Sequence, residues 1–242
     1  SDQRGLILRA VDKIFDDAKE LEERGWQHSI QVSFLEIYNE NLRDLLDNRY
    51  GFDKKMDIKL DKETGMSAVP GLVTMEVLDS RAVESLLRRA SKARATAATD
   101  CNERSSRSHS IFTLKVRGVH EGSQQEYCGV LNLVDLAGSE RVSLSGAQGA
   151  RLTETRNINK SLSNLGDVIS ALANKDVHVP YRNSKLTHFL QPCLGGNSKT
   201  LMLVNVSPSA HHLHETLCTL RFADKVSSCD VGTAHRSNRV KF

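Results

Sequence analysis

The sequence has no long apolar run, no closely spaced cysteine pair and little net charge, and each absence excludes a class of protein. No apolar run approaches the ~18 residues needed to cross a bilayer, and the N-terminus has no signal-peptide pattern. The five cysteines are widely spaced without a C-x-x-C pair, which argues against a zinc module or a disulfide scaffold and favours reduced thiols in the cytosol or nucleus. Net charge is only +3, so any basic surface must be local. We therefore expect a soluble, intracellular chain with no membrane partner.

A phosphate-binding loop is also missing, because the pattern G-x-x-x-x-G-K-[ST] occurs nowhere in the chain. GGNSKT at Gly195–Thr200 comes near it, but Cys193 and Ser198 stand where glycine is required, and a strand pattern follows instead of a helix. HHLHE at His211–Glu215 lacks a clear fourth ligand for a metal site. NKDV at Asn174–Val177 has its aspartate one place too early for a guanine-binding motif. None of these strings is a candidate site.

Apolar periodicity predicts helices that alternate with strands. Helices are expected at residues 5–25, 80–98, 153–173 and 214–228, with short helical pieces ending near 47 and within 179–196. Strands are expected near 28–38, 56–60, 72–77, 111–120, 127–138 and 200–208, and those around 130–134 and 200–208 are apolar enough to be buried on both faces. The pattern predicts one α/β domain, a three-layer sandwich with a mostly parallel central sheet and helices on both faces.

Two polar stretches carry the chemistry. NERSSRSHS (Asn102–Ser110) offers small hydroxyls for magnesium and water, and a guanidinium for a carboxylate or phosphate. The competing interpretation is a Ser/Arg-rich surface loop or a phosphorylation site. NLVDLAGSER (Asn132–Arg141) places Asp135 at the end of an apolar strand, where α/β enzymes hold a metal ion or sense a phosphate. Its competing interpretation is a strand that ends in an exposed turn.

Together the two stretches are far more specific than either alone. A Ser-Ser-Arg loop, one hairpin and then D-x-x-G-x-E is the layout of a two-switch nucleoside triphosphatase. At this level the sequence resembles the kinesin motor domain, whose two switch motifs these stretches match. Further similarity to that family covers nearly the whole chain, in the strings GLILRAVDKIF, VSFLEIYNENLRDLL, NINKSLSNLGDVISAL and HVPYRNSKLTHFLQPCLGGNSKTLMLVNVSP.

The resemblance implies that the chain works on ATP with Mg²⁺. Ser106 would ligate the metal ion, and Ser105 would position the attacking water and relay its proton. Arg107 and Glu140 would form the ion pair that closes the two switches on the nucleotide.

Three further residues have implied roles in the same site. Asp135 would hold the metal ion through a water, Gly138 would bond the γ-phosphate, and Asn102 would support the first switch loop near the nucleotide. Switch I then spans residues 102–110 and switch II residues 135–141.

The resemblance also implies a microtubule-facing segment at 143–190. Basic residues outnumber acidic ones there, and those expected to contact tubulin are Arg151, Arg156, Lys160, Arg182 and Lys185. A local basic face suits an acidic polymer, although an ordinary solvated helix face is the competing interpretation. Nucleic acid is a poor alternative, because Tyr181 is not accompanied by interleaved aromatic residues for base stacking.

In kinesins the phosphate loop lies upstream of the helix that GLILRAVDKIF resembles, after the first sheet strands. We therefore expect residues 1–242 to be roughly the C-terminal two-thirds of a motor domain, with an open sheet edge and no second domain. The alternative is a kinesin-like, non-catalytic microtubule-binding module. The basic ending TAHRSNRVKF, without heptads, resembles C-terminal-motor kinesins. This resemblance implies minus-end movement and dimerisation through an upstream coiled coil. It also implies a location in the cytoplasm and cytoskeleton, with the spindle or nucleus as further locations.

Overall fold

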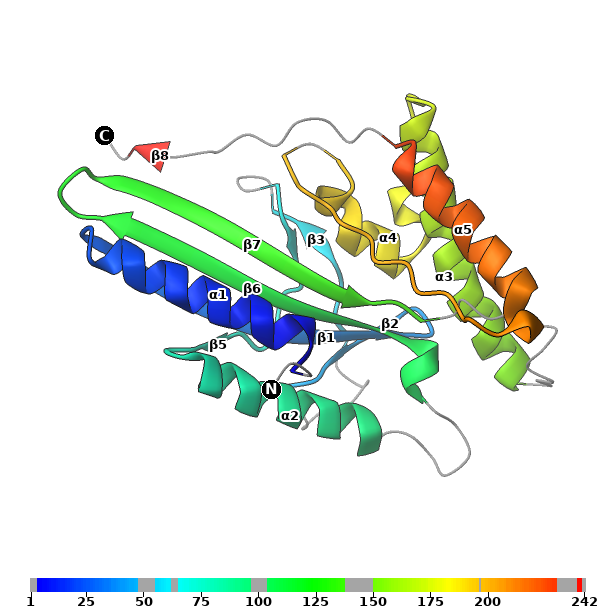
Figure 1. The fold of residues 1–242 in the computed structure, drawn as a ribbon, viewed down its shortest axis with the longest axis horizontal. Coiled ribbons are helices and arrows are strands. Elements are labelled where there is room, and N and C mark those ends of the chain that lie inside the picture. Colours follow the sequence, from blue (N-terminus) through cyan, green and yellow to red (C-terminus); the bar gives the residue numbers. More distant parts are fainter. Residues whose placement is uncertain are drawn as a thin grey trace.

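A computed structural model describes residues 4–47, 55–61, 65–96, 104–137, 150–195, 197–229 and 239–240. Its centre is a sheet with strand order β2-β1-β6-β7-β8, in which β5 also pairs with β1 (Figure 1). The strands of this sheet are β1 (Trp26–Tyr38), β2 (Asn41–Asp44), β5 (Met75–Glu76), β6 (Ser108–His120), β7 (Gln125–Asp135) and β8 (Arg239–Val240). A separate small ladder pairs β3 (Lys59–Leu60) with β4 (Ser67–Ala68).

Every pairing among the described strands is antiparallel. The prediction of a mostly parallel sheet is therefore wrong for these strands. The connections explain this for two of the pairs: β1 turns directly into β2 and β6 turns directly into β7, and a tight turn can join only antiparallel neighbours. Parallel neighbours would need a crossover of a dozen or more residues.

Helices cover both faces of the sheet, as predicted (Figure 1). The helices are α1 (Gly5–Glu22), α2 (Ser80–Thr96), α3 (Ala150–Ala173), α4 (Lys185–Leu190) and α5 (Leu213–Ser227), with 3-10 turns η1 (Arg104–Arg107), η3 (Tyr181–Asn183), η4 (Gln191–Cys193) and η5 (Ala210–His212). Each long helix lies within three residues of its predicted bounds. No helix in the described part of the chain combines the length and apolarity that crossing a bilayer requires.

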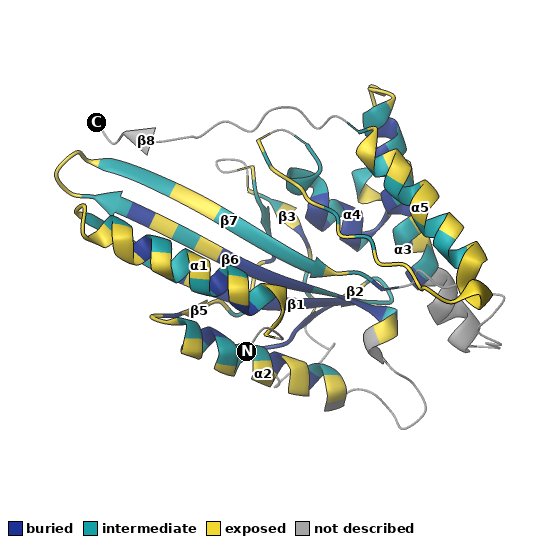
Figure 2. Cartoon of the chain, viewed as in Figure 1, coloured by how far each residue is buried: buried dark blue, intermediate teal, exposed yellow. Residues whose placement is uncertain are grey.

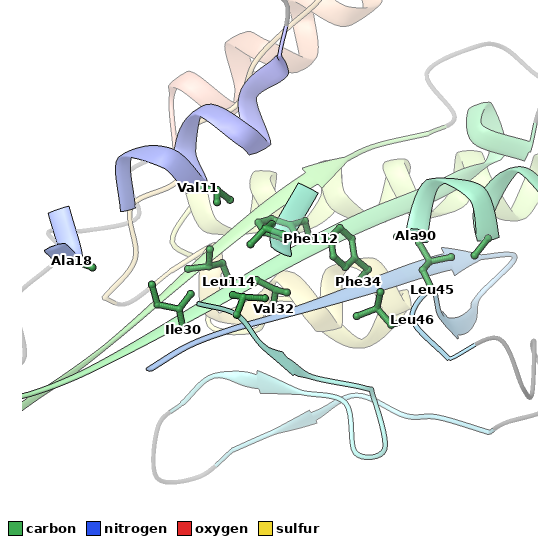
Figure 3. Close-up of a cluster of buried hydrophobic side chains, with 13 residues drawn as sticks. Val11, Ala18, Ile30, Val32, Phe34, Leu45, Leu46, Ala90, Phe112 and Leu114 are labelled. Carbon is green, nitrogen blue, oxygen red and sulfur yellow. The ribbon is translucent and has the colours of Figure 1, made fainter. Parts of the chain in front are cut away.

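Alternation along β1 and β6 separates two cores, because successive side chains point to opposite faces. Val32, Phe34 and Phe112 belong to the cluster under α1 and α2 (Figure 3). Leu35 and Ile111 belong to the cluster that α3, α4 and α5 cover from the other side. The three-layer sandwich is thus confirmed.

The short helical piece predicted before residue 47 is wrong. Asn39 and Glu40 have φ angles of 50° and 59°, which is the conformation of a two-residue hairpin turn between right-handed twisted strands. The chain therefore turns back on β1 as β2, with Leu35 opposite Asp44. Leu42 is buried against the same core as Leu35, so sheet pairing and burial together favour the strand.

The outer side of β7 is open among the described residues. β6 pairs along all of β7, whereas β8 pairs with it only at Gln125 and Glu126. The apolar residues 130–134 are half-buried (Figure 2), so the prediction of a strand buried on both faces is wrong. A groove of about 2530 Å³ runs along this edge and extends to the α1 face of the sheet, lined chiefly by β7, α1, α3, α5 and residues 197–205. The expected open edge is confirmed for the described strands.

The predicted buried strand at 200–208 is also wrong. These residues are irregular, and Leu201 and Leu203 are 83% and 62% exposed. They line the groove across from β7, and no described strand pairs with them. A strand needs a neighbour for its backbone N–H and C=O groups, which the described part of the chain does not supply.

Candidate functional site

The β6–β7 hairpin brings the two chemistry-bearing stretches to one place. η1 leads directly into β6, β7 ends at Asp135, and the register sets Ser110 opposite Asp135. The turn of the hairpin is at the far end, after His120. Two segments separated by a long hairpin in the sequence therefore meet at its open end (Figure 1).

The predicted nucleotide-site residues are placed only in part. Ser106 is exposed and Arg107 half-buried in η1, and the Asp135 side chain is 73% exposed. Ser105 lies in η1, but its side chain is outside the described part. Asn102, Gly138 and Glu140 lie outside the described residues altogether, and with them the expected pair between Arg107 and Glu140.

Arg94 is a residue of this site that sequence reasoning missed. It lies in the last turn of α2, and its guanidinium donates to the Ser108 carbonyl at 2.7 Å and to the Ser108 hydroxyl at 3.3 Å. Its Nη1 also lies 3.3 Å from Asp135 Oδ2. Arg94 thus ties the start of β6 to the end of β7. A basic residue in the last turn of a helix was the available signal, but that also suits the helix dipole alone.

Glu36 is a second residue that the sequence did not single out. It is 0% exposed near the C-terminal end of β1, and its carboxylate lies 3.4 Å from Arg43 Nη1 and 3.9 Å from Arg94 Nε. The ionic cluster Arg43–Glu36–Arg94–Asp135 therefore runs from β2 to β7 under the site. Its only sequence signal was a glutamate between the apolar residues Leu35 and Ile37.

His109 is buried on the opposite face of the hairpin, at 3% exposure. Its Nε2 lies 2.6 Å from the Ser161 hydroxyl of α3, and its Nδ1 accepts a hydrogen bond from the Ala137 N–H at 3.1 Å. Burial lowers the pKa of His109 to about 4, with the charge of Asp135 raising it and that of Arg94 lowering it. The ring is therefore neutral at physiological pH.

The His109 pKa predicts a pH dependence of stability. An unfolded histidine with a pKa of 6.5 binds protons that the folded ring, with a pKa of about 4, does not, so the free energy of unfolding should rise with pH across this window and fall as pH drops through it. The full gain is about 3 kcal/mol above the unfolded pKa. Denaturant unfolding of the complete motor domain at several pH values would measure it, and an equal slope in His109→Asn would contradict the assignment.

The predicted polymer-facing residues are also placed in part. Lys160 of α3 and Arg182 of η3 are exposed, and the two elements pack together through a 2.9 Å bond from the Asn164 amide to the Asn183 carbonyl. Lys185 forms an ion pair with Asp57, which lowers the pKa of that carboxyl. The side chains of the predicted contacts Arg151 and Arg156 lie outside the described part.

The family model described as the kinesin motor domain matches residues 1–229. This chain belongs to the kinesin motor-domain family. The resemblance found in the sequence is thereby confirmed.

Kinesin relatives match the chain over almost its full length. It is 52% identical to kinesin-like protein KIN-14M of Arabidopsis thaliana, covering 97% of this chain and 32% of that protein. It is 54% identical to kinesin-like protein klpA of Emericella nidulans (98% and 31%), and 48% identical to Carboxy-terminal kinesin 2 of Xenopus laevis (98% and 37%). The predicted C-terminal-motor subfamily is supported, and the chain spans about a third of the length of these curated relatives.

Solved kinesin structures confirm the fold. The structure titled as that of a fast kinesin, with implications for ATPase mechanism and interactions with microtubules, is 41% identical with a TM-score of 0.87. The match covers 98% of this chain and 66% of that one. The α/β architecture of the kinesin motor is therefore present here.

Proposed function

We propose that this chain is the larger part of a motor domain that couples ATP hydrolysis to movement along microtubules. The observation that carries the proposal is the register of the β6–β7 hairpin, which sets Ser110 opposite Asp135 and so brings the strand that follows the Ser-Ser-Arg turn to the residue where the D-x-x-G sequence begins. A site that senses a phosphate from two sides needs this juxtaposition. The solved fast kinesin, whose title names an ATPase mechanism and interactions with microtubules, supports this function.

The donor chemistry at this end of the hairpin fits Mg²⁺. The Ser106 hydroxyl and the Asp135 carboxylate are hard oxygen ligands of the kind that Mg²⁺ takes, often through a water. Exposure of both residues leaves them accessible to a metal–nucleotide complex. When bound, Mg²⁺ would neutralise charge on the phosphates as the terminal phosphoryl group is transferred to water.

The chain's own residues would then hold and orient the reactants. Ser105 positions the attacking water and relays its proton, while Arg107 pairs with Glu140 to exclude bulk water. The Gly138 N–H donates to a γ-phosphate oxygen, which a residue without a side chain permits. Arg94, in the last turn of α2, orients the Asp135 carboxylate through its 3.3 Å contact.

The phosphate loop is the part that these residues do not supply. The groove along β7 has a largely apolar lining. The outer side of β7 borders it on one side, and the irregular residues 197–205 border it on the other. This space suits a further sheet strand of the kind that precedes the phosphate loop in kinesins. Residues 1–242 alone are therefore expected to bind ATP weakly, because they hold no G-x-x-x-x-G-K-[ST] sequence. Calorimetry should detect tight binding only to the whole protein, and micromolar binding by residues 1–242 alone would refute this.

The same absence keeps a second candidate open: a non-catalytic kinesin-like module that binds microtubules beside an active partner. The two candidates separate on one reading of the whole protein's sequence. A G-x-x-x-x-G-K-[ST] string upstream of α1 favours the motor, and its absence favours the non-catalytic module. Minus-end movement and dimerisation through an upstream coiled coil are further parts of the motor proposal, supported by its C-terminal-motor relatives.

Lys160 and Arg182 would form the centre of the microtubule-facing surface. Replacing both with alanine is expected to weaken microtubule binding about three- to tenfold at low ionic strength, because they are exposed cations that face an acidic polymer. The difference from wild type should shrink at high salt. Co-sedimentation at two salt concentrations would measure it, with Lys19→Ala in α1, on the opposite face of the sheet, as the matched control. Equal losses in the two variants would contradict the surface.

A further inference from the structure

His109 lies at a junction between the nucleotide end of the hairpin and the helical layer. On one side its Nδ1 is 3.1 Å from the backbone nitrogen of Ala137, and on the other its Nε2 is 2.6 Å from Ser161 Oγ. Ser161 in turn bonds the Ile158 carbonyl at 2.6 Å. All four residues are buried, at 2–5% exposure.

The direction of every bond in this chain is fixed by its members. The Ala137 N–H can only donate, so His109 Nδ1 must accept and its proton must be on Nε2. Nε2–H therefore donates to Ser161 Oγ, whose own hydrogen goes to the Ile158 carbonyl. Because the groups are buried, breaking one bond leaves a polar atom without water to replace its partner.

The ends of this chain belong to the two functional surfaces. Ala137 follows Asp135 by two residues and precedes Gly138, the residue proposed to meet the γ-phosphate. Ser161 directly follows Lys160, which is exposed on α3. If the segment after Asp135 moved by itself, the buried hydrogen bond between Ala137 and His109 would break. The bond survives only if His109 and α3 move together with that segment, as they would in a two-state element that couples two sites.

We propose that His109 is a positioning residue that couples the segment after β7 to α3 through its bonds to Ala137 and Ser161. The inference rests on the proposed motor function, and it names the contact through which the nucleotide end and the polymer-facing helix would sense each other. The competing role is a histidine that only fills and stabilises the core.

Three variants of the whole protein separate the two roles. Ser161→Ala removes the α3 end of the link with little helix cost. His109→Asn keeps an acceptor near Nδ1 for Ala137 but cannot reach Ser161, whereas His109→Gln keeps a donor near Nε2 but loses the close acceptor. Ser170→Ala is the matched control, because Ser170 bonds the Gly166 carbonyl on the same helix at 2.8 Å without touching the hairpin.

Basal and microtubule-stimulated ATP hydrolysis and the melting temperature would be measured for each variant. Coupling predicts that Ser161→Ala keeps basal hydrolysis but loses about tenfold of the stimulation by microtubules. Both His109 variants should lose the stimulation by a similar factor, and Ser170→Ala should behave as wild type. Combining His109→Asn with Ser161→Ala should cost no more than either alone, because both remove the same bond.

Three results would overturn the proposal. Wild-type stimulation in Ser161→Ala would show that the link carries no coupling. A parallel fall of basal and stimulated rates, following the melting temperature, would show a purely structural role. A wild-type protein without microtubule-stimulated hydrolysis would remove the proposed function itself, and that failure is visible before any variant is made.

Discussion

Replacing Arg107 with alanine in the whole protein is expected to abolish microtubule-stimulated ATP hydrolysis while leaving microtubule binding intact. Arg107 ends η1 immediately before β6, at the open end of the hairpin where Asp135 also lies. Without its ion pair to Glu140 the two switches would not close around the nucleotide, and misplaced catalytic groups cost on the order of 100-fold in rate.

The control for this experiment is Arg88→Ala. Arg88 is an exposed arginine of α2 whose ion pair with Glu84 is local to the helix, so its loss should leave hydrolysis unchanged. Glu140→Ala should reproduce the Arg107 defect if the two side chains act as a pair. Retained stimulation in either Arg107→Ala or Glu140→Ala would refute the closing role.

Replacing Glu36 with alanine is expected to lower the free energy of unfolding by about 3–5 kcal/mol. Glu36 is 0% exposed and lies between the guanidinium groups of Arg43 and Arg94. Removing the carboxylate takes from Arg43 and Arg94 the counter-charge that they share and leaves Arg94 paired with the exposed Asp135, and burying a poorly compensated charge is costly.

Denaturant unfolding of the complete motor domain would measure the Glu36 effect. Glu36→Gln keeps the side-chain volume and so separates the loss of charge from the loss of packing. Glu84→Ala removes an exposed carboxylate that also pairs with an arginine, and it should cost less than about 1 kcal/mol. A similar small loss in Glu36→Ala would contradict a stabilising ionic cluster.

Local sequence order was enough to predict the main parts of the fold and the proximity of the two stretches that form the candidate site. Helical spacing located the long helices: α1, α2 and α3 each bury one apolar face, and α5 packs Phe222 and Val226 against the core. The proximity of the segments that hold Ser110 and Asp135 also followed from local order, because only one hairpin separates them.

The failures have a common cause in long-range pairing. Leu42, Leu45 and Leu46 are spaced as on a helix, yet the turn at Asn39 and Glu40 and pairing with β1 make this segment a strand and its continuation. Propensity is a weak prior when a sheet neighbour is present. Residues 200–208 fail in the opposite way, as a strand pattern without a described neighbour.

The supporting residues of the site were missed for a related reason. Arg94 reaches Asp135 across 41 positions of sequence, and His109 reaches Ser161 across 52. Each looks ordinary within its own element, as a helix-end arginine and a histidine at the start of a strand. Only the packed layers reveal that they connect the hairpin to α2 on one face and to α3 on the other.

The most direct test of the account is the steady-state rate of ATP hydrolysis by the whole protein, with and without microtubules. A motor domain should show slow hydrolysis alone, a rate that rises and saturates with added microtubules, and loss of that rise in Arg107→Ala but not in Arg88→Ala. Microtubule binding with no hydrolysis at any microtubule concentration would contradict the motor and leave the non-catalytic module.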